Sequence, residues 1–167
     1  MRTNNVLMIR PVSFSYNEET ARSNTFQNKQ DVSLETIQAE FDNSVEMLKE
    51  AGVNVMVVED TKEPEKPDAV FPNNWIQLRD DGRVVLFPMR TPNRRAERRM
   101  DVVDLLANEF QVAERLDLSH HESSNRILEG TGSLVFDHYR KVGYACVSPR
   151  TNGELARDYI KSIGYTP

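Results

Sequence analysis

An acid beside two glycines is the feature of this sequence most suited to chemistry. In the stretch NRILEGTGSLVFD, residues 125–137, Glu129 stands directly before Gly130-Thr131-Gly132 and an apolar alternating run typical of a strand. Glycine allows another chain or a ligand to come close, because it has no Cβ. Two interpretations remain open: Glu129 is a solvated acid at the start of a strand, or it is an acid held at a binding site.

Two arginines occupy comparable places in an internal repeat. Residues 74–93 and residues 133–152 each read as a strand, a polar turn, a second strand and a Pro-containing Arg-Thr segment that ends in Asn. Arg90 and Arg150 belong to these segments. Each would be interpreted as a surface arginine if it stood alone, so the repeat is what makes them candidates for a shared role.

Two other groups are set aside. Cys146 is the only thiol, but it lies in the apolar stretch GYACVS, which predicts a buried, inert cysteine in a strand. His120, His121 and Glu122 suggest a metal site, yet adjacent histidines lack the separated spacing of zinc motifs, and a loop is the simpler interpretation. We expect no metal and no nucleophile from these residues.

The elements that must position the candidates follow from periodicity. The repeated hairpins are expected to feed helices, the first over Pro92–Asn108 and the second from a cap at Asn152 to Ile163. The stretch FQVAERLDL, residues 110–118, predicts a strand after the first helix, so the repeat unit is strand, strand, helix, strand. Within the first helix, a run of arginines is interpreted as a solvated or salt-bridged stripe: Arg94, Arg95, Arg98 and Arg99, with Glu97 nearby.

The N-terminal part predicts a strand, helix, strand unit. Short β-branched runs at 6–12 and 53–60 flank a segment with helical apolar spacing. Asp31 or Ser33 would cap that helix, and the polar stretch from Phe14 to Gln30 predicts a long loop before it.

Length and composition narrow the classes of function. A chain of 167 residues suits one domain with a real core. The formal net charge of −5 argues against a nucleic-acid binder, which needs a dense basic face. No apolar run is long enough for a membrane span or a signal peptide, and one cysteine allows no internal disulfide, so we expect a soluble cytoplasmic protein.

Four ordered motifs on this repeat resemble the pentein superfamily, which holds arginine deiminases, dimethylarginine dimethylaminohydrolases and amidinotransferases. They are PDAVFPNNWIQL (67–78), PMRTPNRRAE (88–97), LEGTGS (128–133) and SPRTN (148–152). The opening VLMIRPVSFSYNEETARSNTFQ (6–27) resembles the citrulline-utilisation, arginine-deiminase-related branch. The resemblance implies an α/β fold, a five-fold pseudosymmetric propeller of strand-strand-helix-strand repeats, and that 1–167 is the N-terminal half of one incomplete domain.

The resemblance also implies roles for individual residues. Glu129 corresponds to the carboxylate that orients a catalytic histidine, while the nucleophilic cysteine and that histidine lie outside this chain. Asp68 corresponds to the residue that binds the substrate's α-ammonium, and Arg90 and Arg150 to arginines that grip its α-carboxylate.

Two amides mark a departure from the family pattern. Asn73 and Asn74 stand where the dimethylarginine hydrolases have acids that hold a guanidinium. An amide both donates and accepts hydrogen bonds and so suits a neutral ureido group, which points toward citrulline. The alternative is that Pro-Asn-Asn is simply a turn.

The resulting prediction is an amidinotransferase-like hydrolase that acts on the ureido or guanidino carbon of citrulline or a related arginine derivative, without metal or organic cofactor. The alternative is a non-catalytic amino-acid-binding or assembly module. Open sheet edges also predict self-association.

Overall fold

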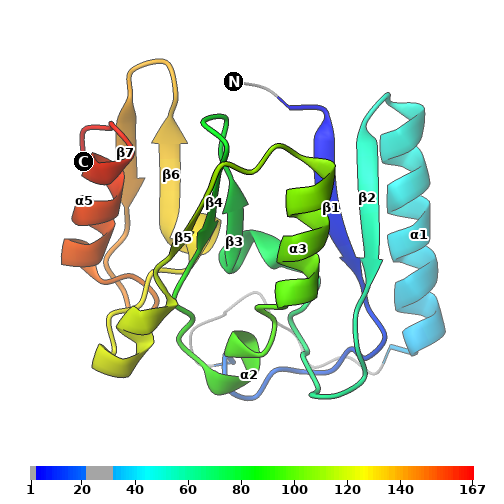
Figure 1. The fold of residues 1–167 in the computed structure, drawn as a ribbon. Coiled ribbons are helices and arrows are strands. Elements are labelled where there is room, and N and C mark those ends of the chain that lie inside the picture. Colours follow the sequence, from blue (N-terminus) through cyan, green and yellow to red (C-terminus); the bar gives the residue numbers. More distant parts are fainter. Residues whose placement is uncertain (1–2, 22–31) are drawn as a thin grey trace. The chain divides into compact units, whose positions relative to one another are not determined.

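Helices and strands are interspersed along the chain (Figure 1), which confirms the predicted α/β class. The computed structural model describes residues 3–21 and 32–167. These residues fall into two units, one ending at Pro72 and the other running from Asn73 to Pro167.

The N-terminal unit is the predicted strand, helix, strand arrangement. β1 (Asn5–Arg10) and β2 (Asn54–Glu59) pair in parallel, and α1 (Leu34–Glu50) connects them and packs beside β2. A parallel pair needs such a crossover, since a tight turn cannot join two strands that run the same way.

The start of α1 confirms one of the two predicted caps. Ser33 Oγ accepts a hydrogen bond from Thr36 N at 3.2 Å, which satisfies one of the backbone donors left open at a helix start. Asp31, the alternative cap, and residues 22–30 of the predicted loop lie outside the described residues.

A buried lysine closes the loop that follows β2. Lys66 is only 1% exposed, and its Nζ donates to Thr61 O at 2.8 Å, Thr61 Oγ1 at 2.8 Å and Pro64 O at 2.7 Å. Asp60 Oδ1 lies 3.3 Å from the same nitrogen. All three donors of the ammonium are used, and its charge is compensated, so the burial of this lysine is stabilised.

The second unit begins with the first copy of the repeat. β3 (Ile76–Leu78) pairs antiparallel with β4 (Arg83–Leu86), and β4 pairs in parallel with β5 (Glu114–Asp117). The strand predicted over 110–118 is therefore present, as β5.

The helix predicted over Pro92–Asn108 is wrong as a single element. It is split into α2 (Pro92–Arg95) and α3 (Met100–Glu109). The interruption has a physical cause, because arginines of α2 and of the break bond to the segment before it: Arg95 Nε donates to Met89 O and Arg98 Nη1 to Phe87 O. These bonds hold the chain against that segment, and a new helix starts only after Arg99.

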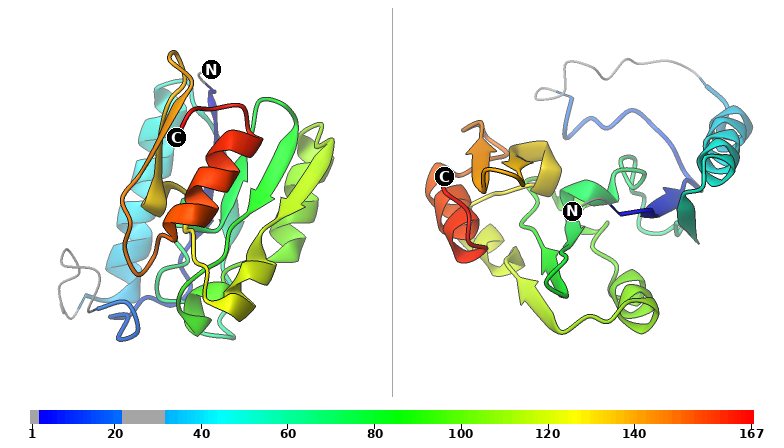
Figure 2. Two further views of the ribbon diagram at one scale, coloured as in Figure 1. Left: turned by 90° about the vertical axis from the view of Figure 1, so that its left-hand side faces the viewer. Right: turned by 90° about the horizontal axis from the view of Figure 1, so that it is seen from above.

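The second copy of the repeat follows the same order. η2 (Ser119–Ser124) and α4 (Gly130–Ser133) lead into β6 (Leu134–Asp137), which pairs antiparallel with β7 (Val142–Ala145). α5 (Gly153–Ser162) packs along β7, as both views of Figure 2 show. Asn152 caps α5 as predicted, since its Oδ1 accepts from Leu155 N at 2.9 Å.

The two copies of the repeat share a hydrogen bond between the hairpin turn and the segment that follows the helix. Each hairpin turn contains a residue with positive φ, Gly82 at 79° and Lys141 at 57°. The carbonyl of Gly82 accepts from Ala113 N at 2.8 Å, and that of Lys141 accepts from Thr166 N at 2.7 Å. In both copies the chain that returns after the helix thus lies parallel to the second strand, as the bridge between Val142 and Thr166 also shows.

The core of the second unit forms where α5 meets the strands. Val85 and Phe87 pack with one face of α5, and Phe87 and Tyr159 meet edge to face with ring centroids 5.3 Å apart. The buried residues of α5 recur at helical spacing, which is the reason the sequence forms an amphipathic helix here. They are Leu155, Ala156, Tyr159 and Ile160, and the C-cap Ile163 continues the same face.

Cys146 corrects a prediction, because it is exposed rather than buried. β7 ends at Ala145, and side chains alternate between the two faces of a hairpin. Tyr144, two residues earlier, is 56% exposed, and its partner Val135 is 67% exposed. Cys146 therefore lies on the same exposed side of the β6–β7 hairpin as Tyr144 and Val135.

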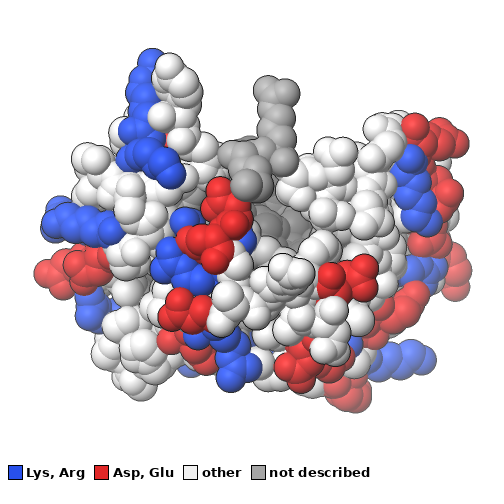
Figure 3. Space-filling model, turned by 45° about the horizontal axis from the view of Figure 1, so that its top comes forward, with Lys and Arg blue, Asp and Glu red and all other residues white. Residues whose placement is uncertain are grey.

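Two further features concern the charged side chains on the surface and the apolar character of the helices. On the face drawn in Figure 3, Lys and Arg side chains lie among Asp and Glu side chains rather than forming a basic surface. Within the described parts of the chain, no helix has both the length and the apolar character that crossing a bilayer requires.

Candidate active site

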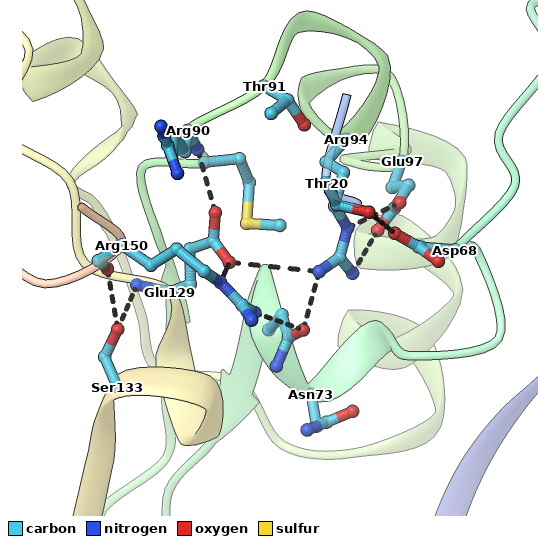
Figure 4. A network of polar contacts seen from close by, with 12 residues as sticks. Thr20, Asp68, Asn73, Arg90, Thr91, Arg94, Glu97, Glu129, Ser133 and Arg150 are labelled. Atoms are coloured by element: carbon cyan, nitrogen blue, oxygen red, sulfur yellow. Dashed lines mark hydrogen bonds and ion pairs between the residues drawn. The ribbon is translucent and has the colours of Figure 1, made fainter. Parts of the chain in front are cut away.

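Glu129 lies between the Arg-Thr segments of the two repeat copies. Its Oε1 accepts from Arg90 N at 2.9 Å, and its Oε2 accepts from Arg150 Nε at 2.5 Å (Figure 4). Its own N–H donates to Ser133 Oγ at 2.9 Å. Glu129 is 1% exposed, so the interpretation as a solvated acid is wrong. A buried carboxylate needs paired charge and hydrogen bonds, and both repeat copies supply them.

The glycines beside Glu129 allow the approach that the sequence suggested. Gly130 has φ +36°, and a Cβ on it would lie 2.4 Å from Asn73 O. A Cβ on Gly132 would lie 3.0 Å from Asn74 Nδ2 and 2.9 Å from Arg150 Nη2. The distances of 2.4 and 2.9 Å are too short for real Cβ atoms and that of 3.0 Å is tight, so glycine is what permits the two asparagines to lie against α4.

Asn74 is the hub of the network, and the orientation of its amide is determined by its neighbours. Its Oδ1 accepts from Arg94 Nη1 at 2.7 Å and from Arg150 Nη2 at 3.3 Å. Guanidinium nitrogens only donate, so the atom that faces both arginines must be the oxygen. The Nδ2 group makes no hydrogen bond within the described part of the chain.

Arg94 is a site residue that sequence reasoning missed. The sequence predicts a solvated or salt-bridged stripe here. Arg94 is salt-bridged to Glu97, but it is buried, at 3% exposed, and not on a solvated face. Its Nε and Nη2 donate to the two carboxylate oxygens of Glu97, both at 2.9 Å, and its Nη1 also lies 3.9 Å from Glu129 Oε2 (Figure 4). The signal that could have found it is the glutamate three residues later, which can form a bidentate pair within one turn.

A neighbouring arginine does form the expected salt bridge. Arg98 Nη1 and Nη2 donate to Glu122 Oε1 and Oε2 at 2.9 and 3.2 Å, and Met89 N donates to Glu122 Oε1 at 2.9 Å. The predicted His-His-Glu loop forms the 3-10 turn η2. Its Glu122 accepts both from Met89 N, at the start of the first Arg-Thr segment, and from Arg98, in the break between α2 and α3. In residues 3–21 and 32–167, no cluster of three or more His, Cys, Asp or Glu side chains could hold a metal ion.

Three other predicted site residues of the second unit, Asn73, Arg90 and Arg150, differ in the hydrogen bonds that they make. Asn73 is exposed, and its Nδ2 donates to Thr131 Oγ1 at 2.5 Å. Arg90 enters the network through its backbone N–H, while its side chain makes no hydrogen bond among the described residues. Arg150, with a side chain 26% exposed, joins the network directly.

Asp68 belongs to the N-terminal unit and makes its hydrogen bonds within that unit. It is buried, and its Oδ2 accepts from Asn17 Nδ2 at 2.7 Å and from Thr20 Oγ1 at 3.3 Å. Both donors come from the polar stretch predicted as a long loop, so Asp68 anchors the beginning of that stretch.

The network in the second unit is balanced in charge. Glu97 and Glu129 face Arg94 and Arg150, with Asn74 bonded to both arginines. A carboxylate has about four lone-pair positions, and Glu129 uses two of them in hydrogen bonds from Arg90 N and Arg150 Nε. Glu129 therefore keeps capacity to accept from a further donor such as an imidazole.

The sequence matches one family along nearly its whole length. The model of the family described as "N,N dimethylarginine dimethylhydrolase, eukaryotic" matches residues 10–167. No curated protein sequence matches the chain significantly.

Solved structures share the fold. ArgZ, an arginine dihydrolase from the ornithine-ammonia cycle in cyanobacteria, is 21% identical with a TM-score of 0.71, covering 95% of this chain and 22% of ArgZ. DDAH from Pseudomonas aeruginosa, in a mutant complexed with citrulline, is 14% identical with a TM-score of 0.71, covering 99% of this chain and 60% of DDAH. AgrE, solved with ornithine and NAD+, is 19% identical with a TM-score of 0.67, covering 90% and 20%.

These matches confirm the resemblance to the pentein superfamily, to which all three relatives belong. The chain spans less than two thirds of the length of each of these solved structures.

Proposed function

Because this chain belongs to the N,N-dimethylarginine dimethylhydrolase family, we propose that its polar network is the amino-acid half-site of an amidinotransferase-like hydrolase. In the proposed reaction a thiolate attacks the ureido or guanidino carbon of citrulline or a related arginine derivative and displaces ammonia or an amine. Water then attacks the same carbon, breaks its bond to sulfur and releases the thiol. An imidazole carries the proton, and Glu129 orients the imidazole. The thiol and the imidazole come from residues outside this chain.

The roles proposed for the two arginines use groups that the network leaves available. Arg150 Nη1 makes no hydrogen bond among the described residues, so it can donate to the substrate's α-carboxylate while Nε stays on Glu129. The side chain of Arg90 is available for the same carboxylate, since only its backbone is used. Asp68 is proposed to take the α-ammonium, and exposed Asn73 to contact the substrate beside Asn74.

The observation that carries the substrate class is the orientation of the Asn74 amide. With Oδ1 held by two arginines, the group left for a ligand is Nδ2, which is a donor. A guanidinium carries only donors and cannot pair with it, whereas a ureido group offers a carbonyl oxygen. The site therefore favours citrulline over arginine.

Isothermal titration of citrulline and of arginine into the 167-residue chain tests this proposal, after a circular dichroism melt has verified cooperative folding. We expect saturable binding of citrulline, weaker binding of arginine, and loss of both in Arg150→Ala. A cooperative fold that binds neither ligand would contradict the proposed half-site.

One observation favours the alternative, an assembly module. Val135, Tyr144 and Val147 are 67%, 56% and 74% exposed around the β6–β7 hairpin, and large apolar side chains grouped on a surface commonly mark an interface. Sedimentation of the chain over a range of concentrations would reveal self-association. A monomer that binds citrulline would favour the hydrolase half-site.

The proposed architecture extends the repeat described above. Two copies and the N-terminal strand, helix, strand unit are taken as parts of one domain, incomplete in this chain, with five such units around a central channel. The proposed setting is the cytoplasm, in keeping with a single cysteine.

A further inference from the structure

We propose that Arg94 is a positioning residue that sets the substrate preference of the site by holding the Asn74 amide in one orientation. This inference rests on the proposed function, because it explains how the site would distinguish a carbonyl group from a guanidinium. Arg94 itself is assigned no contact with the ligand.

The amide of an asparagine can present either of two faces. Rotation by about 180° about χ2 exchanges Oδ1 with Nδ2 at little cost, because this torsion is broad. In Asn74 such a rotation would turn Nδ2 toward Arg94 Nη1 and Arg150 Nη2, so that donors would face donors. The arginines therefore select the orientation in which Nδ2 remains available.

Arg94 contributes more to this selection than Arg150. The hydrogen bond from Arg94 to Asn74 is 2.7 Å long and the one from Arg150 is 3.3 Å. The side chain of Arg94 is 4% exposed, compared with 26% for Arg150. A short bond from a buried charged donor is stronger than a long bond from a partly hydrated one.

Glu97 makes the orientation of Arg94 independent of the ligand. It takes Nε and Nη2 of the guanidinium in a bidentate pair, which leaves Nη1 directed at Asn74. Because the guanidinium is planar and rigid, fixing two nitrogens fixes the third. Arg150 is the arginine proposed to bind the ligand's carboxylate, whereas Arg94 is held by Glu97 without a ligand, so the amide is oriented before binding.

Removing Arg94 should therefore change selectivity more than affinity as a whole. Without its strongest constraint, Asn74 could rotate and offer Oδ1 to a guanidinium. Citrulline should bind more weakly and arginine more tightly. We expect the preference for citrulline to fall by about tenfold, the effect of losing one favourable hydrogen bond.

The test compares two substitutions of the pair. Arg94→Met alone would remove the bidentate ion pair of the buried Glu97 and could unfold the chain. The informative variant is therefore Arg94→Met with Glu97→Met, which removes both charges and keeps apolar volume. The matched control is Glu46→Met with Lys49→Met, which removes an ion pair of the same i,i+3 spacing from the surface of α1. Titration of citrulline and arginine gives the ratio of dissociation constants, which should drop in the first double variant and not in the control.

A second measurement uses the unaltered chain. In a ¹⁵N–¹H spectrum, the side-chain NH₂ signals of Asn74 are assigned by their disappearance in Asn74→Asp. Citrulline should shift these signals at saturation, and arginine at equal occupancy should not. If the double variant fails to fold, this result still tests the amide orientation that Arg94 is proposed to hold, because signals that do not respond would overturn the inference.

The possible failures can be told apart. If the unaltered chain binds neither amino acid, the proposed function and this inference both fall. If it binds citrulline but the Arg94/Glu97 variant keeps the same preference within about twofold, only the role of Arg94 is overturned. If it binds citrulline but the Asn74 signals do not respond, this inference falls together with the substrate class proposed from the Asn74 amide.

Discussion

Gly132 lies against Asn74 with no space for a side chain between them, since a Cβ on Gly132 would lie 3.0 Å from Asn74 Nδ2. The glycine thus sets how closely α4 can approach the amide that the proposed ligand contacts. The same Cβ would lie 2.9 Å from Arg150 Nη2, so both groups would have to move if the glycine were replaced.

Gly132→Ala should weaken citrulline binding by about tenfold or more, because it displaces the amide and the guanidinium together. The free energy of unfolding should fall by roughly 1–3 kcal/mol, as for other overpacked sites. Titration and chemical denaturation measure the two effects. Gly153→Ala is the control, because its Cβ would meet only Val147 Cγ2 at 3.1 Å on an exposed side chain. Equal losses of binding in both variants would contradict the role assigned to Gly132.

Asn74→Asp should reverse the ligand preference. A carboxylate accepts only, so one oxygen can keep the bonds from Arg94 and Arg150 while the other faces a guanidinium. We expect arginine to bind more tightly than citrulline in this variant, by titration at neutral pH. Asn73→Asp makes the same chemical change one residue away, at an exposed amide bonded to Thr131. A comparable reversal in the Asn73 variant would show that added negative charge, and not the Asn74 amide, determines the preference.

Gly143→Ala tests the contact between β7 and α5. A Cβ at this position would lie 2.8 Å from Ile160 Cγ2 and 2.9 Å from Ile160 Cγ1, inside the core. The substitution should lower the free energy of unfolding by roughly 1–3 kcal/mol. In an Ile160→Ala background the same substitution should cost almost nothing, because the clashing atoms are gone. Denaturant melts of the four chains form a double-mutant cycle, and an additive cycle would contradict the packing described for Gly143.

The pH dependence of stability should include a contribution from Asp81 in the β3–β4 turn. The Arg83 side chain donates to Asp81, and this bond, with a further one from Arg79, holds the pKa of that carboxyl well below its usual range. The stabilisation is complete above the unfolded pKa of about 3.9 and is lost as pH falls from there toward the lower folded pKa.

Asp81→Asn should therefore lower Tm at pH 7, and the difference from the unaltered chain should shrink below about pH 4. Thermal melts of both chains at pH 7 and at pH values below about 4 measure this difference in Tm. Asp80→Asn is the control, since Asp80 forms no ion pair among the described residues. A difference in Tm that stays constant with pH would mean that Asp81 acts without its charge.

The sequence predicted the elements better than their side-chain environments. The hairpins, the cap at Asn152 and the strand around Glu114 could be predicted because turn residues and apolar periodicity are local signals. The break between α2 and α3 could not, because it depends on bonds from Arg95 and Arg98 to a segment several residues earlier.

The candidate site shows the same division. The glycines beside Glu129 predicted a close approach, because lack of a Cβ has a steric meaning that depends on no partner. Arg94 was interpreted as part of a solvated or salt-bridged stripe, and its burial was missed, because helical spacing places it with other charges and says nothing about which face is covered. Cys146 was interpreted as buried for the opposite reason: an apolar strand predicts a covered face, and here one side of the hairpin is open.

The buried amine of Lys66 gives the N-terminal unit a chemical reporter of its own opening. At 1% exposure, with three hydrogen bonds to Thr61 and Pro64, this nitrogen is shielded from acylating reagents that modify surface lysines at once. It becomes reactive only when the loop after β2 opens, so its labelling rate follows that opening rather than the chemistry of the reagent. Pulse labelling followed by mass spectrometry of the peptide around Lys66 would thus time local unfolding in the unaltered chain, with no engineered probe.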